Sequence, residues 1–450
     1  MSGDVVVLRG SDPSHPTVHQ WLGVPFGTPP VSNLRFLSAV PALYYGGGPH
    51  AAVTYKPICY QNSDTSSSDF WTLVPEFQNT DDQSEDCLYL NIWAPKKPAV
   101  EKKKVPVLVW VCGGGFAEGG GHAPYQVPDR WIERTQSHIV VTFNYRLNVL
   151  GFPAAAGALG NPGLSDIRLV VEWVRGNIEG FGGDPNHIVM WDDPIVTGLI
   201  PDSGSSNLDG SLTTNSTGFS MLAQSFNCGK LTAAAELACM QMVEALELQA
   251  YIRNTTGSVL GNTRFWGTVA DNVTVFANNT QRLVGGKIAK VPLITGVNRN
   301  EGGAFGAFSL NQTVGPDPAQ VEMANVMFVC GVGGEADNRA KHGLTTYRYL
   351  FKGNFSNITP RYWLGAMHSF ADRKKAELPV VFGTHDLFRG NSTELEWQTS
   401  YSMEAFWFSF TANSTTALVD DNGLAWPKYG GENSAIMVFG DDGIGKAAQV

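Results

Sequence analysis

The sequence predicts an α/β fold in which a central, mostly parallel β-sheet is covered by helices on both faces. Short runs rich in β-branched residues read as buried strands: Val105–Cys112, His138–Asn144, His187–Trp191 and Val291–Gly296. Between the second and third runs, Leu164–Glu179 repeats apolar residues at helical spacing. Strands that alternate with helices are typical of parallel sheets. In such sheets the chemistry takes place in loops beyond the carboxyl ends of the strands.

The chain length and the charge distribution restrict the class of protein. The 450 residues contain no internal repeat and no low-complexity linker, so we expect a single domain over residues 1–450. The net charge is −10 and the only basic run is Lys102-Lys103-Lys104, which gives nucleic-acid binding no electrostatic support. No apolar stretch approaches the roughly 18–20 residues that span a bilayer, so we expect no membrane span. No metal-ligand spacing or nucleotide-binding glycine motif stands out, and we expect no cofactor.

Glycosylation motifs and cysteines favour a secretory, oxidising route. The chain has six cysteines, a number that is ambiguous by itself. Asn-x-Ser/Thr motifs are dense and begin at Asn215, Asn254, Asn272, Asn278, Asn311, Asn354, Asn357, Asn391 and Asn413. Against this, the first ten residues have no basic region followed by an apolar one, as a signal peptide would. We therefore expect a secreted, extracellular ancestry, with the signal peptide not present in this chain.

Several short segments along the chain carry a family resemblance. In chain order they are Trp21–Pro30, Glu85–Pro95, Cys112–Phe116, Asn144–Phe152, Asn161–Asp166, Phe181–Asn186, Gly296–Gly302, Gly365–His368 and Leu378–Thr384. Each is weak alone, but together and in this order they resemble the type B carboxylesterase/cholinesterase family of the α/β-hydrolase fold. The resemblance implies hydrolysis of carboxylic esters by a Ser-His-Glu triad, with a small-molecule ester as substrate. In such a triad the serine attacks the carbonyl, the histidine transfers its proton and the carboxylate orients the imidazole.

The resemblance assigns two of the three triad positions. Glu301, just after the strand Val291–Gly296, stands where the family has its acid. His368 matches the family histidine, although the charged stretch Phe370–Lys375 follows it where the family has a shorter connection. His385 is a lesser candidate for this role. The remaining candidates, His122 and His342, are expected to be ordinary polar loop residues.

The resemblance also implies an oxyanion loop and two disulfides. Backbone N–H groups of Gly114 and Gly115 would stabilise the tetrahedral oxyanion, and glycine is needed there because a Cβ would block close approach. Cys112, just before these glycines, is expected to be a small buried residue rather than a substitute nucleophile. The implied disulfides are Cys59–Cys87 and Cys228–Cys239, which leave Cys112 and Cys330 unpaired.

The nucleophile itself is missing. The family has Gly-x-Ser-x-Gly directly after a strand such as His187–Trp191, on a sharp turn that leads into a helix. Here Trp191 is followed by Asp192-Asp193-Pro194, and Gly-x-Ser-x-Gly occurs nowhere in the sequence. Ser203 matches the end of the next strand rather than the elbow. We therefore expect a fold that is incomplete around residues 191–199, because a crossover between parallel strands needs about a dozen residues or more.

The missing turn decides between the functions that the resemblance allows. We expect a protein of serine-esterase ancestry whose present chain is catalytically inactive or nearly so. The alternative is a non-catalytic binding or adhesion member of the same family, which is less favoured because such members keep the backbone of the elbow. A chain that does not fold, and an active esterase that uses Ser203 or Cys112, are the remaining hypotheses. An absent helix of about fifteen residues corresponds to on the order of 10 kcal/mol of lost apolar burial, so a normal core is itself in question.

Overall fold

A computed structural model describes most of the chain. The described residues are 7–449 except 11, 44–49, 62–73, 80–81, 98–102, 159, 191–195, 207–216, 256–266, 305–317, 359–375, 431–433 and 442–444.

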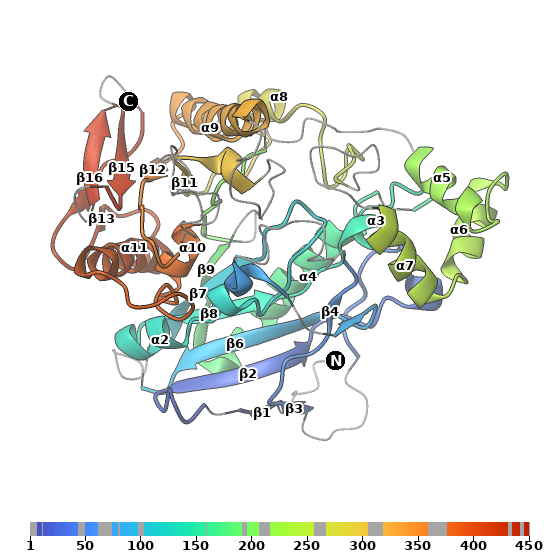
Figure 1. The fold of residues 1–450 in the computed structure, drawn as a ribbon, viewed down its shortest axis with the longest axis horizontal. Helices are drawn as coiled ribbons and strands as arrows, with labels where there is room; N and C mark the ends of the chain where they lie inside the picture. The colour runs from blue at the N-terminus through green and yellow to red at the C-terminus, as the bar shows by residue number, and fades with distance from the viewer. Residues whose placement is uncertain are drawn as a thin grey trace.

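A ten-stranded sheet forms the centre of the molecule (Figure 1). Its strands, in spatial order, are β16 (Gly445–Gln449), β15 (Ala435–Phe439), β12 (Thr346–Phe351), β11 (Leu293–Asn298), β10 (Gly198–Leu199), β9 (Gly183–Met190), β7 (Val105–Val111), β8 (Ile139–Phe143), β6 (Tyr89–Pro95) and β2 (Val18–Pro25). The strands from β15 to β8 run parallel to one another. Antiparallel strands close both edges, with β6 and β2 at one and β16 at the other. The mostly parallel sheet that the sequence predicts is confirmed.

Three small two-stranded sheets lie outside the central one. They pair β1 (Val7–Arg9) with β3 (His50–Ala52), β4 (Ile58–Cys59) with β5 (Gln83–Ser84), and β13 (Leu418–Val419) with β14 (Ala425–Trp426).

Helices connect the strands. The described α-helices are α2 (Asp129–Thr135), α3 (Asn148–Gly151), α4 (Pro162–Asn177), α5 (Thr217–Ser225), α6 (Ala233–Gln241), α7 (Ala245–Thr255), α8 (Asn279–Val284), α9 (Pro318–Lys341), α10 (Glu377–Val381) and α11 (Glu394–Ala412). The 3₁₀ helices are η1 (Ser32–Leu34), η3 (Pro75–Phe77), η4 (Pro124–Gln126), η5 (Ile178–Phe181) and η6 (Glu301–Ala304). Among the described residues, no helix has both the length and the apolar character needed to cross a membrane.

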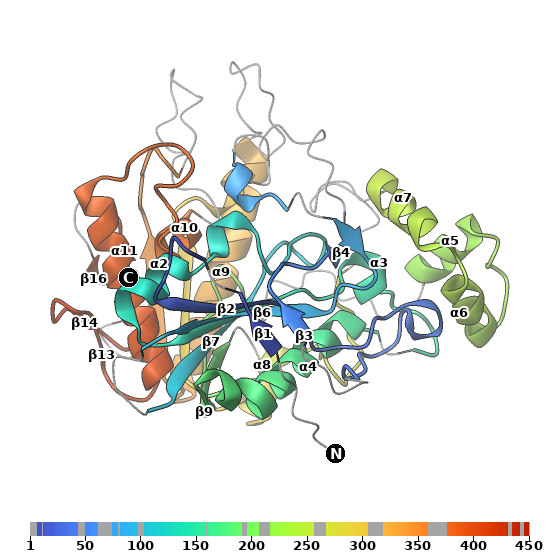
Figure 2. The ribbon, with the colours of Figure 1, turned by 90° about the horizontal axis from the view of Figure 1, so that it is seen from below.

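Both faces of the sheet are covered (Figure 2). The alternation of side chains along β7 shows this directly, because neighbouring residues belong to different cores. Leu108 packs in one core with side chains of α10 and α11. Val107 and Val109 pack in the other with Val170 and Val174 of α4. The helix predicted over residues 164–179 is therefore α4, with its apolar stripe against the sheet.

The connection between β9 and β10 is as short as the sequence predicts. Only residues 191–197 separate the two strands. Gly198 and Leu199 pair with Val189 and Met190, so β10 begins beside the end of β9 rather than beside its start. The backbone N–H and the hydroxyl of Thr197 both donate to the Ile188 carbonyl, at 2.8 and 3.0 Å. β10 therefore has only two residues, and its first residue already pairs with Val189, near the end of β9.

The sheet nevertheless continues across this connection. Leu199 of β10 also pairs with Leu293 of β11, which links the two halves of the sheet. Met190, Leu199 and Leu293 are all less than 7% exposed, and Val196 from the connection joins their core. The expected shortage of apolar burial is therefore not seen at these side chains.

Candidate active site

Glu301 is held at the carboxyl end of the central sheet. It begins η6, shortly after β11 ends at Asn298, and its side chain is fully buried. Its Oε1 accepts hydrogen bonds from the Asn298 backbone N–H at 2.6 Å and from the Asn298 side-chain amide at 3.3 Å. It also accepts from the Ser203 hydroxyl at 2.5 Å. Three donors on one carboxylate oxygen hold the side chain in a single orientation.

Ser203 supports this carboxylate. The residue follows β10 and has a positive φ of 53°, and its N–H donates to the Gly296 carbonyl at 2.9 Å. This backbone bond ties it to β11 and directs the hydroxyl toward Glu301. The position agrees with the expectation that Ser203 stands at the end of the next strand, away from the nucleophile turn.

Two further carboxylates lie next to Glu301. The Asn298 side-chain amide donates to Glu377 Oε2 at 2.6 Å, and the Tyr349 hydroxyl donates to Asp202 Oδ1 at 2.8 Å. Asp202 is partly exposed as a residue, but its Oδ2 atom is shielded from solvent. Sequence reasoning missed both acids, although Asp202 precedes Ser203 and Glu377 begins the Glu-Leu-Pro segment.

Burial and mutual repulsion change the proton affinity of these acids. Burial raises the pKa of Asp202 to about 7, and the nearby Glu301 charge contributes in the same direction. Burial, followed by the charges of Asp202 and Glu301, also raises the pKa of Glu377 well above its usual value. A site of this kind attracts positive charge, as an imidazolium would supply.

The candidate histidines are in different situations. His368 lies outside the described residues. His385 is fully buried, with Nδ1 at 2.5 Å from Ser392 Oγ and 3.3 Å from Glu396 Oε1. Its ring packs edge-on against Trp397. His385 is thus paired with Glu396, which argues against the alternative that it serves Glu301.

The other two histidines differ in burial: His122 is buried, unlike the polar loop residue that the sequence predicts, and His342 is exposed. His122 is buried and stacks on Tyr55, with ring centroids 4.5 Å apart. His342 lies just after α9, with its Nδ1 at 2.7 Å from the Asn338 carbonyl oxygen.

The glycine loop after β7 presents free backbone donors. Gly114 and Gly115 both have positive φ values, 141° and 62°, and a Cβ at Gly114 would lie 2.1 Å from the Glu118 carbonyl oxygen. The Gly114 carbonyl accepts from the N–H groups of Ala117 and Glu118, which closes the turn. Within the described part of the chain, the N–H groups of Gly114 and Gly115 have no hydrogen-bond partner. The loop can therefore donate to an oxygen that is brought to it.

Cys112 and Tyr125 connect this loop to the carboxylates. Cys112 is buried in the core, and its carbonyl accepts from the Tyr145 hydroxyl at 3.1 Å. Burial and the neighbouring Cys112 raise the pKa of Tyr125 well above its usual value. Asp202 and Glu377 raise it further, so Tyr125 lies within electrostatic range of both groups.

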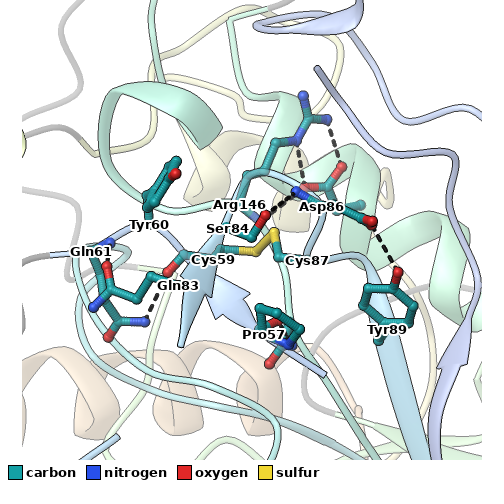
Figure 3. The surroundings of a disulfide bond; sticks show 12 residues. Pro57, Cys59, Tyr60, Gln61, Gln83, Ser84, Asp86, Cys87, Tyr89 and Arg146 are labelled. Atoms are coloured by element: carbon teal, nitrogen blue, oxygen red, sulfur yellow. Dashed lines mark hydrogen bonds and ion pairs between the residues drawn. A yellow bond between two sulfur atoms is a disulfide. The ribbon is translucent and has the colours of Figure 1, made fainter. Parts of the chain in front are cut away.

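The structure contains both expected disulfides. Cys59–Cys87 joins β4 to the segment before β6, with a Cα–Cα distance of 5.0 Å (Figure 3). Beside it, the Tyr89 hydroxyl donates to Asp86 Oδ1 at 2.9 Å. Cys228–Cys239 links the end of α5 to α6. Cys112, which is buried, and Cys330, which is exposed, form no disulfide in the described structure.

Among the described residues, no group of three or more His, Cys, Asp or Glu side chains is arranged to hold a metal ion.

Comparison with known proteins finds relatives that are esterases and lipases. The model of the Carboxylesterase family matches residues 3–194, so the match ends within the short connection after β9. A chlorogenic acid esterase of Aspergillus niger is 41% identical over 460 residues, 95% of this chain and 87% of the relative. Secreted lipase 5 of Gibberella zeae is 36% identical over 93% of this chain and 85% of its own length. A cholinesterase of Mus musculus is 29% identical over 92% of this chain and 78% of its own.

Proposed function

Because the chain belongs to the carboxylesterase family, we propose that it descends from a serine hydrolase of carboxylic esters and that the present form does not turn esters over. The connection between β9 and β10 carries this proposal. Residues 191–197 contain no serine and leave no room for a nucleophile turn with its helix. Loss of a triad serine alone lowers kcat by about 10⁶ in a well-studied serine protease. Here the N–H that follows the serine is lost as well.

The remaining machinery supports the ancestry. Glu301, fixed by Asn298 and Ser203, has the burial and orientation needed to hold an imidazolium. We propose His368 as that imidazole and Gly114 and Gly115 as the oxyanion donors. The unpartnered N–H groups of this loop support the second assignment. In the complete enzyme, the histidine would take the serine proton and return it to the leaving alcohol.

The relatives suggest a substrate class and a location. We propose a small-molecule carboxylic ester as the ancestral substrate, because the relatives include a chlorogenic acid esterase and a cholinesterase. We further propose an extracellular glycoprotein. The two disulfides and the similarity to a secreted lipase support an oxidising secretory route.

Turnover of p-nitrophenyl butyrate by the present and a repaired chain tests the function. The repair inserts, after Trp191, a Gly-x-Ser-x-Gly turn followed by a helix of about fifteen residues. The present chain should show no turnover above the uncatalysed rate, because it cannot form an acyl intermediate. The repaired chain should turn the ester over with a kcat at least about 10⁴-fold higher.

Variants of the repaired chain test the role of Glu301. Glu301→Gln should lower kcat by on the order of 10³–10⁴, because the imidazole loses its orienting carboxylate. Glu172→Gln makes the same chemical change on the exposed face of α4 and should leave kcat unaltered. A folded, repaired chain that stays inactive would indicate that the segment around residues 370–375 is also damaging, and would favour the non-catalytic binding role.

A further inference from the structure

The described Asn-x-Ser/Thr motifs differ sharply in their surroundings. Asn413 ends α11, is exposed, and has an extended backbone with φ of −160°. Its side-chain Oδ1 accepts two hydrogen bonds from Thr415, from the backbone N–H at 3.1 Å and from the hydroxyl at 2.7 Å. Among the described residues, the Nδ2 amide nitrogen has no hydrogen-bond partner. The side chain of Asn413, the first residue of the motif, is therefore already bound to the hydroxyl of Thr415, the third residue.

We infer that Asn413 is an N-glycosylation site of this protein and carries an oligosaccharide on its Nδ2 atom. The donor is a polyisoprenyl-diphosphate-linked oligosaccharide of the secretory route. Nδ2 attacks C1 of the first sugar, a C–N bond forms and the C–O bond to the diphosphate breaks. Nδ2 loses one proton and the polyisoprenyl diphosphate leaves. The hydrogen bond from the Thr415 hydroxyl to Oδ1 makes the Nδ2 protons more acidic, which favours the loss of one of them to solvent.

Ser414, the middle residue of the motif, attaches the motif to the folded protein without involving the side-chain amide of Asn413. Ser414 is buried, and its hydroxyl donates to the Thr197 carbonyl at 2.7 Å. The carbonyl of Thr416, two residues after Ser414, accepts from the Tyr347 hydroxyl at 3.1 Å. Neither contact involves the exposed Asn413 side chain, so a glycan on Asn413 would break neither.

Asn357 shows the opposite situation. It is 5% exposed, and its Nδ2 donates to the His385 carbonyl at 2.9 Å and to Ser392 Oγ at 2.8 Å. A sugar on this nitrogen would remove at least one of the two bonds and would have to lie inside the protein. The folded chain therefore carries no glycan at Asn357, although its sequence motif is as good.

Other described motifs use their polar groups for local structure. The hydroxyl of Thr274, in the motif that begins at Asn272, donates to Asp271 Oδ2 and accepts from Asn161. The hydroxyl of Thr393, in the motif that begins at Asn391, caps α11. Asn278 caps α8 with its own Oδ1. The side chains of Thr274, Thr393 and Asn278 therefore stabilise turns and helix ends, whereas the side chains of Asn413 and Thr415 bind each other.

Site-resolved mass spectrometry tests this inference. The full chain is expressed in a eukaryotic host behind a host secretion leader, and the retained and secreted pools are both treated with a peptide amidase that removes N-glycans in heavy-oxygen water. We expect Asn413 to be recovered as heavy-oxygen aspartate in both pools. Asn357 should be recovered as unmodified asparagine in the secreted pool.

Matched variants make the result specific. Asn413→Gln and Thr415→Ala should each remove one glycan, seen as one step in electrophoretic mobility, and Asn357→Gln should remove none. Unmodified Asn413 in both pools overturns the inference, as does a glycan on Asn357 in the secreted pool. The inference rests on the proposed glycoprotein character of the chain, but the added leader supplies the secretory route and ester turnover is not read, so the test can fail without affecting the proposed loss of ester turnover.

Discussion

At the scale of single residues, Asp202 is the most unusual member of the site. Its carboxylate receives the Tyr349 hydroxyl and lies close to Glu301 and Glu377, two other buried acids. Placing a third acid beside two others is unfavourable when all are ionised. The raised pKa of about 7 means that Asp202 holds its proton in the folded protein at mildly acidic pH.

Asp202→Asn should therefore stabilise the protein at neutral and alkaline pH. The folded pKa of about 7 lies above the unfolded value of 3.8, so the folded state binds more protons between these values. Stability due to this residue thus falls as pH rises from about 4 to 7 and stays low above that. The variant cannot ionise at this position. At pH 8 its free energy of unfolding, measured by urea unfolding, should exceed that of the parent by on the order of 2–4 kcal/mol. At pH 4 the two free energies of unfolding should be equal.

Asp82→Asn is the matched control, because Asp82 is exposed. It should change the urea midpoint little at either pH. A parent and an Asp202→Asn variant with the same midpoint at pH 8 would show that Asp202 carries no unfavourable charge in the folded state.

Sequence motifs could locate Glu301 but not its acidic neighbours. Glu301 stands in a segment that resembles its family throughout, so its position after β11 could be read from the chain. Asp202 becomes its neighbour because it pairs with Gly296 of β11, and Glu377 because α10 begins beside Asn298 at the end of β11. Proximity of this kind depends on tertiary packing, for which a single sequence has no local signal.

At the scale of elements, a buried ion pair joins two parts of the chain that are distant in sequence. Glu76 in η3 is 1% exposed, and Arg389, in the segment between α10 and α11, donates to both of its carboxylate oxygens. Arg389 Nε also donates to the Asn357 carbonyl at 2.9 Å. Next to Glu76, the ring of Phe77 lies 4.7 Å from that of Tyr125. The pair therefore fixes part of the Cys59–Cys87 loop against the site.

Glu76→Gln should destabilise the protein by about 2–4 kcal/mol, because it leaves the Arg389 guanidinium without its charged partner in a largely buried position. Urea unfolding followed by tryptophan fluorescence measures this change. Glu179→Gln, which breaks the exposed pair of Glu179 with Lys104, should change stability by less than about 1 kcal/mol. Equal effects of the two substitutions would show that the Glu76–Arg389 pair is not a structural anchor.

The elements differ in how well the sequence predicts them. Apolar β-branched runs predict β7 and β8 to within one residue of their observed ends, because both strands are buried on both faces. The strand expected at 187–191 instead begins at Gly183, because β9 carries extra residues between Gly183 and Ile188, which pair with Val105 and Val107 of β7. Such an irregularity depends on the neighbouring strand and leaves no periodic pattern in β9 itself.

At the scale of the whole molecule, the sheet continues across the position where the family signal stops. The Carboxylesterase family match ends at residue 194, and β10 still pairs with both β9 and β11. The two halves of the sheet therefore stay joined, although the shortened strand makes few ladder bonds. The lack of a nucleophile turn therefore does not interrupt the sheet. We expect the chain to keep the fold of its family but not to hydrolyse esters.

Intact-mass analysis after exposure to a fluorophosphonate tests the central claim most directly, because this reagent phosphonylates an activated serine and adds one fixed mass. The present chain should keep its original mass. The chain repaired after Trp191 should gain one adduct, located by peptide mapping on the inserted serine. An adduct on the present chain, whether on Ser203, Cys112 or any other side chain, would contradict the account.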